Sequence, residues 1–161
     1  MTLRRLLLAV ALAAAAAGLA CGGGSSAPGD AAGPALTVRD DGAGGVTVEA
    51  TWGTDAHLNA SDDLASVAAT YTGREVTFVH VRLDTHSVDL SKYDLAALAE
   101  LETSAGRQAA LAFHPLSAEG HHVAGVLAFP GRWKPERARL LVRDVGGVPL
   151  RRLEWVTTPA D

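Results

Sequence analysis

Short segments that alternate apolar and polar residues recur between residues 36 and 155, and they restrict this part of the chain to an all-β fold. The clearest is 74–84, where the odd-numbered positions 77–83 read Thr, Val, Val and Leu. In an extended strand these side chains share one face, which we expect to point into the core. The chain has one cysteine, so no internal disulfide can form and the packing of sheets must hold the domain together.

Turn-forming residues separate the β-like segments along the chain. The expected strands cover residues 36–39, 46–52, 74–84, 98–103, 108–113, 123–129, 139–143 and 150–155. Helical turns are expected at 63–69 and 94–99. About seven short strands with regularly spaced turns predict a single immunoglobulin-like antiparallel β-sandwich over residues 36–159, with a partly open barrel as the alternative.

The first 21 residues have the composition of an export signal. Arg4 and Arg5 precede an apolar run over residues 6–20, which is shorter than the roughly 20 residues that span a bilayer. Gly-Leu-Ala-Cys at 18–21 resembles a bacterial lipobox, in which the cysteine becomes the lipidated first residue of the mature protein. The resemblance implies a lipoprotein signal peptide at 1–20 and a membrane anchor on Cys21. The alternative is cleavage nearby, which leaves a soluble periplasmic protein with a free thiol.

Residues 21–35 follow as a stretch rich in Gly, Ser, Ala and Pro. Such a segment buries too little apolar surface to fold, so we expect a flexible tether. Residue 22 is Gly, not the Asp of a retention signal. By resemblance to lipoproteins, this implies the periplasmic face of the outer membrane in a Gram-negative cell. In a Gram-positive cell, the protein would lie on the outer face of the cytoplasmic membrane.

Charge is unevenly distributed in the chain from Cys21 onward, which carries 12 basic and 18 acidic side chains. This acidic balance argues against nucleic acid as a partner. Residues 131–161, however, have a net charge of +3. The arginines of the last predicted hairpin are candidates for contact with anionic headgroups or an acidic protein surface, and the alternative is a solvated face that protects an edge strand. They are Arg139, Arg143, Arg151 and Arg152.

Histidines in two local motifs are candidate metal ligands. Asp84 and His86 lie at the end of a predicted strand, while His114 precedes a loop that leads to His121 and His122. Imidazole and carboxylate groups suit Zn(II) or Cu(II) in an exported protein. A soft Cu(I) site is excluded, because the only methionine is the initiator and the only cysteine is the lipidation candidate. The alternative is that these side chains brace strand-to-loop corners by bonding to the backbone.

Catalytic motifs are missing from the sequence. It contains no Gly-x-Ser-x-Gly elbow, no EF-hand loop and no phosphate-binding glycine motif between a strand and a helix. Asp84, His86 and Ser87 lie too close together in one extended segment to form a triad. We therefore expect a protein that is not an enzyme.

Residues 78–129 resemble a group of bacterial envelope proteins that share three short motifs. They are Thr-His-Ser-Val-Asp-Leu, Gly-His-His and Gly-x-Leu-x-Phe-Pro, found here at 85–90, 120–122 and 125–130. No activity is established for that group, so the resemblance implies recurrence of the histidines without a mechanism. The sequence predicts a lipid-anchored, non-catalytic envelope protein that binds Zn or Cu(II) through histidines. The alternative is a structural or interaction module with an envelope protein as its partner.

Overall fold

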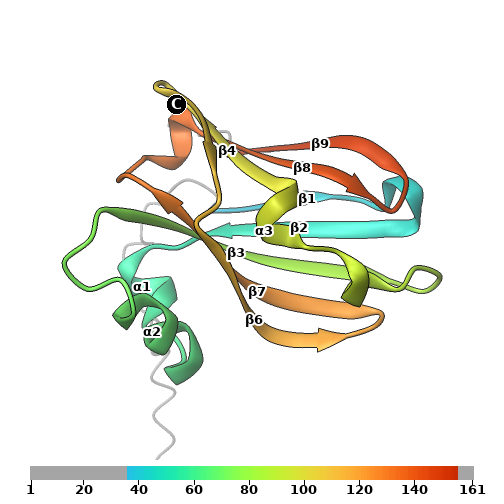
Figure 1. The fold of residues 1–161 in the computed structure, drawn as a ribbon, viewed down its shortest axis with the longest axis horizontal. Coiled ribbons are helices and arrows are strands. Elements are labelled where there is room, and N and C mark those ends of the chain that lie inside the picture. Colours follow the sequence, from blue (N-terminus) through green and yellow to red (C-terminus); the bar gives the residue numbers. More distant parts are fainter. Residues whose placement is uncertain (1–35, 156–161) are drawn as a thin grey trace, which may run out of the picture. The chain divides into compact units, whose positions relative to one another are not determined.

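Two antiparallel sheets pack against each other in the computed structural model, which describes residues 36–155 (Figure 1). The predicted signal peptide at 1–20, Cys21 and the tether at 21–35 lie outside the described residues, as do residues 156–159 of the predicted domain. The prediction of an all-β, two-sheet antiparallel architecture is confirmed. Within residues 36–155, no helix has the length and hydropathy needed to cross a membrane.

The nine strands divide into a five-stranded and a four-stranded sheet. In spatial order, the first sheet contains β1 (Thr37–Asp40), β2 (Val46–Trp52), β3 (Val76–Thr85), β7 (His122–Pro130) and β6 (Ala112–Glu119). The second contains β5 (Gly106–Ala109), β4 (Ala99–Thr103), β8 (Arg139–Val145) and β9 (Val148–Glu154). The last hairpin, β8–β9, lies where its alternating sequence places it.

The main core lies between the inner faces of the two sheets. Val79, Val81 and Leu83 of β3 are almost fully buried there, which confirms the face expected from the alternation of residues 74–84. At one end of the sandwich, Trp52 and Trp155 meet edge to face with ring centroids 4.9 Å apart. Burying a valine or leucine side chain such as those of β3 contributes about 1.5–3 kcal/mol to the free energy of folding.

Two short helices cover part of the outer face of the five-stranded sheet. Helix α1 (Asp55–Leu58) begins at Thr54 and α2 (Asp62–Ala69) begins at Ser61, and each of these hydroxyls accepts a backbone N–H of the first turn. A second, smaller core forms where the helical segment meets strands β3 and β7. It contains Leu58, Leu64, Val67, Tyr71, Phe78, Val126 and Ala128. Because helices cover its outer face, the central part of β7 is buried on both sides.

One helix and three 3-10 turns complete the described elements. Helix α3 (Leu95–Leu98) begins at Asp94, whose carboxylate accepts the backbone N–H groups of Ala96 and Ala97. The 3-10 turns are η1 (Ala43–Gly45), η2 (Leu90–Lys92) and η3 (Pro135–Arg137). The helical turns expected at 63–69 and 94–99 therefore correspond to α2 and α3, with α3 one residue shorter at each end.

The expected strand at 108–113 is wrong, because the chain changes sheets inside it. Ala110 donates its N–H to Ala99 of the four-stranded sheet, and Leu111 donates to Ala128 of the five-stranded sheet. Residues 106–109 and 112–119 are thus separate strands, β5 and β6. Strand β6 continues through Pro115 with a register shift, which an edge strand tolerates because one side makes no ladder hydrogen bonds.

Candidate functional site

The two histidine motifs meet at one end of the five-stranded sheet, where β3 and β7 pair. Asp84 and His122 are directly opposite each other in the register, and His122 Nδ1 lies 2.8 Å from Asp84 Oδ1. Both side chains are roughly half exposed. The end of β3 also contacts the turn between β6 and β7, since the Thr85 N–H bonds to the carbonyl of His121 at 3.1 Å.

The remaining two candidates at this end have different surroundings. His121 is exposed, and its Nδ1 lies 3.2 Å from the carbonyl oxygen of Val88, so the ring fastens the turn after β6 to the loop after β3. His86 is exposed and makes no side-chain hydrogen bond to any residue between 36 and 155. Of the predicted ligands, only Asp84 and His122 are in direct contact.

His114 lies away from this end. It pairs across strands with Val126, four residues along β7 from His122, and four strand residues span about 13 Å. Its Nε2 lies 2.8 Å from the hydroxyl of Tyr71, whose ring it meets edge on. Because Tyr71 follows α2, this contact ties the helical segment to edge strand β6. The position of His114 gives it a bracing role and keeps it from sharing an ion with His122.

A further histidine pair joins α1 to the sheet. His57 Nε2 lies 3.2 Å from His80 Nδ1, with His80 on the outer face of β3. Burial lowers the pKa of His80, the neighbouring His57 lowers it further, and Arg82 adds to this while Glu49 opposes it. Alternation in β3 places His80 on the face opposite Val79 and Val81, but only the docking of α1 brings His57 to it, so no local sequence signal identifies the pair.

The described residues do not gather a complete metal centre. Between residues 36 and 155, no group of three or more His, Cys, Asp or Glu side chains is positioned to hold a metal ion. The Asp84–His122 pair supplies two neighbouring donors, whereas His114 and His121 bond to Tyr71 and to the backbone.

Arg151 was expected among the surface arginines, and that expectation is wrong. Its side chain is 0% exposed and reaches across the sandwich to Asp40 Oδ2 at 2.8 Å. It also donates to the carbonyls of Ala43, Val46 and Val145. Arg151 pairs with Val142 on the inner face of the sheet, so it cannot contact a partner.

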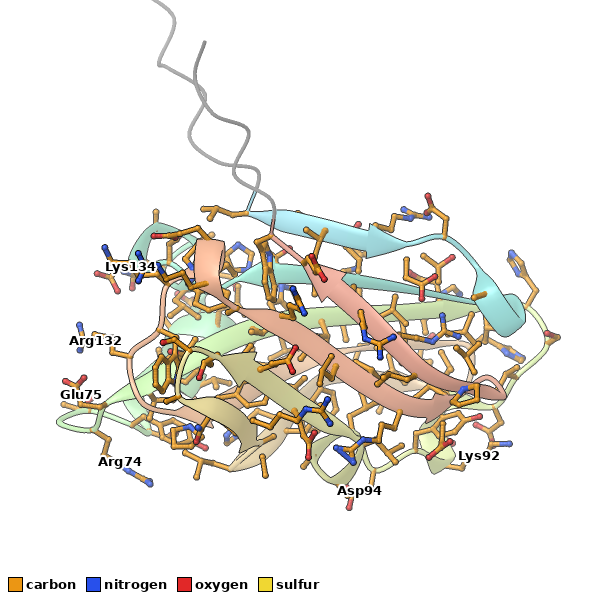
Figure 2. All side chains as sticks on the ribbon, turned by 90° about the horizontal axis from the view of Figure 1, so that it is seen from above. Arg74, Glu75, Lys92, Asp94, Arg132 and Lys134 are labelled. Carbon is orange, nitrogen blue, oxygen red and sulfur yellow. The ribbon has the colours of Figure 1, made fainter. Side chains whose placement is uncertain are left out.

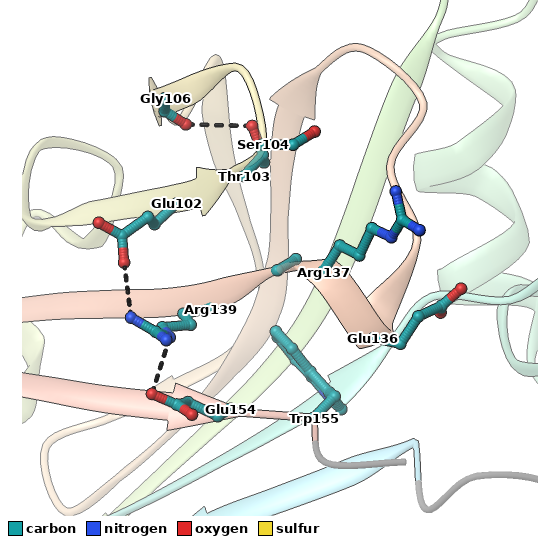
Figure 3. Close-up of a pocket in the computed structure, with 10 residues that line it drawn as sticks. Glu102, Thr103, Ser104, Gly106, Glu136, Arg137, Arg139, Glu154 and Trp155 are labelled. Carbon is teal, nitrogen blue, oxygen red and sulfur yellow. Dashed lines mark hydrogen bonds and ion pairs between the residues drawn. The ribbon is translucent and has the colours of Figure 1, made fainter.

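The other hairpin arginines lie on the outer face of the four-stranded sheet. Arg139 bridges Glu102 and Glu154 at 3.3 and 2.7 Å (Figure 3). Arg143 pairs with Glu100, and the ion pair lowers the pKa of that carboxyl and raises the pKa of the guanidinium. Only Arg152 of the expected group is exposed with no ion pair to a residue between 36 and 155. The face is a mixed charge ladder, which does not concentrate positive charge.

A hollow of about 630 Å³ lies at the end of the sandwich marked by Trp155. Figure 3 shows Arg137 extending away from the Glu102–Arg139–Glu154 bridge. The lining of this hollow includes Thr103, Ser104, Glu136 and Arg137. An adjoining hollow of about 290 Å³ shares Ser104, Glu136 and Arg137 with it and adds Arg132, Trp133 and Lys134. Positive side chains are therefore concentrated in the loop between β7 and β8, at the start of the basic segment 131–161.

Comparison with known proteins adds no relative: no protein-family model, no curated protein and no solved structure matches this chain.

Proposed function

We propose that the protein is a lipid-anchored, non-catalytic interaction module of the bacterial cell envelope. The export signal, the lipobox-like residues 18–21 and the Gly/Ser/Pro-rich segment at 21–35 support anchoring through Cys21. Acyl chains on this residue would hold the protein stably at a membrane. The sandwich would then be the part that meets an envelope protein partner.

The observation that carries the interaction function is the way the histidines are used. His121 is bonded to the Val88 carbonyl, His114 to the Tyr71 hydroxyl, and His122 to the Asp84 carboxylate. Each contact joins two segments that are distant in sequence, and such contacts fix loops and helices on the sheet. The domain would serve as immunoglobulin-like sandwiches do, as a rigid frame that presents loops at its two ends.

Mass spectrometry of the protein purified from its native membrane tests the anchoring. We expect Cys21 to be the first residue and to carry a diacylglycerol thioether. A Cys21→Ser variant should leave the membrane fraction, while a Ser25→Ala variant should stay in it. An intact leader or an unmodified thiol on wild-type protein would contradict the proposal.

Metal binding is the second candidate function, and the Asp84–His122 contact favours it. These two donors are 2.8 Å apart and accessible, so an ion could recruit a third ligand from the exposed His86. Calorimetric titration of the full protein with Zn(II) and Cu(II) tests this function, with His122→Ala as the variant and Arg152→Ala as the control. Affinity for the metal should fall as the solution is acidified, because neutral imidazole is the ligand. Equal binding by wild type and His122→Ala would remove this candidate.

A further inference from the structure

The loop between β7 and β8, residues 131–138, carries three cations and one acid. Arg132, Lys134 and Arg137 are all exposed, and Glu136 is the acid. Arg132 makes a 3.5 Å ion pair with Glu75, which is itself largely exposed. Lys134 and Arg137 make no ion pair with any residue between 36 and 155, in contrast to Arg139 and Arg143 on the sheet.

This loop is held in one conformation by a set of polar contacts. The Thr77 hydroxyl donates to the Gly131 carbonyl at 2.8 Å and accepts the Trp133 backbone N–H at 2.9 Å. The Trp133 indole donates to the Pro130 carbonyl at 2.8 Å. Gly131 has a φ of +87°, and a Cβ there would lie 2.8 Å from the indole. Because the backbone is already ordered, binding through these cations would require little loss of conformational freedom.

The cationic loop lies at the end of the sandwich where the described chain begins. The Leu36 carbonyl accepts hydrogen bonds from the Trp52 backbone at 2.7 Å and from the Trp155 indole at 2.9 Å. Trp155 in turn lines the same hollow as Arg137. The segment that follows Cys21 in the sequence is therefore joined to the domain at the end that carries the loop.

The length of chain between Cys21 and Leu36 sets the average distance between this end and a membrane that holds Cys21. Fourteen residues, 22–35, separate the two, and a flexible chain of that length has an end-to-end distance of about 20 Å. Strand β3, with 10 residues, extends for about 33 Å from this end towards the other. The two ends of the domain would thus lie at different distances from the lipid surface.

Acidic side chains dominate the opposite end. Figure 2 shows Arg74, Arg132 and Lys134 at one end together with Glu75, and Lys92 and Asp94 away from them. The segments at the far end of β2, β3, β7 and β8 carry six acids and three cations. The acids are Asp41, Asp84, Asp89, Asp94, Glu119 and Asp144, and the cations are Arg39, which pairs with Asp41, Lys92 and Arg143. A negatively charged membrane would repel this end. The other end also carries the acids Asp55, Glu75 and Glu136, but its cations Lys134 and Arg137 make no ion pair within residues 36–155 and remain free to attract such a membrane.

We propose that the β7–β8 loop binds the anionic phospholipid headgroups of the membrane that anchors the protein, and so orients the domain with its acidic, histidine-bearing end outward. The orientation rests on the proposed lipid anchor. The affinity of the loop for anionic lipid does not, since it depends on Arg132, Lys134 and Arg137 alone. Each cation near such a surface strengthens binding by about fivefold.

The two lysines of the chain make the proposal testable in the intact protein, because Lys134 lies in the loop and Lys92 at the acidic end. Full-length lipoprotein is reconstituted into vesicles of phosphatidylcholine alone, or with 30% phosphatidylglycerol. An amine-reactive reagent is applied, and labelling is read by peptide mass spectrometry. We expect Lys134 to be labelled about fivefold more slowly on anionic vesicles, with Lys92 unchanged. High salt should restore the labelling of Lys134 by screening the contact.

A charge-matched pair of variants separates the loop from general attraction. Arg132→Gln/Arg137→Gln keeps Lys134 as the reporter and should abolish its protection, whereas Arg82→Gln/Arg152→Gln removes the same charge from exposed sheet positions and should preserve it. Equal labelling of Lys134 on both vesicles, with protein that floats with both, would overturn the headgroup contact but not the anchor. Protein that fails to float with phosphatidylcholine vesicles would instead contradict the proposed function.

Discussion

Replacing Arg151 tests the most consequential buried contact of the fold. Its guanidinium bonds to Asp40 and to three backbone carbonyls, at distances between 2.6 and 3.2 Å. Asp40 ends β1, Ala43 begins η1 and Val46 begins β2, whereas Val145 ends β8. One side chain of β9 therefore fastens the four-stranded sheet to the β1–β2 connection of the five-stranded sheet. Arg151→Met keeps most of the apolar stem and removes every donor.

The expected loss follows from what the substitution leaves behind. Removing one partner of a buried ion pair costs about 3–5 kcal/mol, because the other groups stay desolvated and unpaired. Asp40 is 23% exposed and regains some hydration, so we expect the lower half of that range. Domains of this size have a total unfolding free energy of about 5–15 kcal/mol. The variant should therefore fold but be markedly less stable.

Urea unfolding followed by tryptophan fluorescence gives the measurement. A loss of about 3–4 kcal/mol lowers the urea midpoint by about 1.5–2 M at a slope near 2 kcal/mol/M. Arg152→Met, at the exposed neighbouring position, should stay within about 0.5 kcal/mol of wild type. Arg151→Lys keeps the charge without the planar fork and should fall between the two. Equal midpoints for Arg151→Met and Arg152→Met would refute the assigned role.

Two further substitutions probe the five-stranded sheet. Gly125→Ala would place a Cβ 2.5 Å from the His114 carbonyl and the Phe113 ring, so calorimetry should show a loss of about 1–3 kcal/mol in unfolding free energy. Gly120→Ala is the control, because its nearest contact is at 3.4 Å. Similar melting of both variants would argue against the close approach at Gly125. The lowered pKa of His80 means that the unfolded chain takes up a proton more readily than the fold, so stability should decline as pH falls below about 6.5. His80→Gln should flatten this decline of stability with pH in urea titrations at several pH values, and the control His86→Gln should not. An unchanged pH dependence of stability in His80→Gln would count against the role of His80.

Local alternation was enough to predict most strands and their core faces. In a strand with one buried face, every second side chain points into the core, so apolar residues recur at every second position. The same alternation places Arg151 on the inner face of β9, where the structure has it. Leu153 and Trp155 are buried, and Arg151 has the same parity along the chain. Charge outweighed parity in the sequence-based interpretation, because an inward arginine needs partners that only the folded η1 turn provides.

Contacts between distant segments could not be predicted in this way. The crossing at Ala110 and Leu111 depends on which carbonyl each N–H reaches, and the residues themselves are unremarkable apolar ones. Likewise, Pro115 marks the end of a strand by local rules. The structure instead gives it an edge position, where its missing N–H is harmless.

The histidines show why a list of candidate ligands differs from a site. Parity places His80 and Asp84 on one face of β3, but whether an imidazole acts as a ligand or a brace depends on which groups reach its ring nitrogens. Here Tyr71, Asp84, the Val88 carbonyl and His57 reach four different rings from segments far away in sequence. His86 differs from these four rings in having no such partner within residues 36–155. It is therefore the histidine at which an external ligand or partner would meet the least competition from the fold.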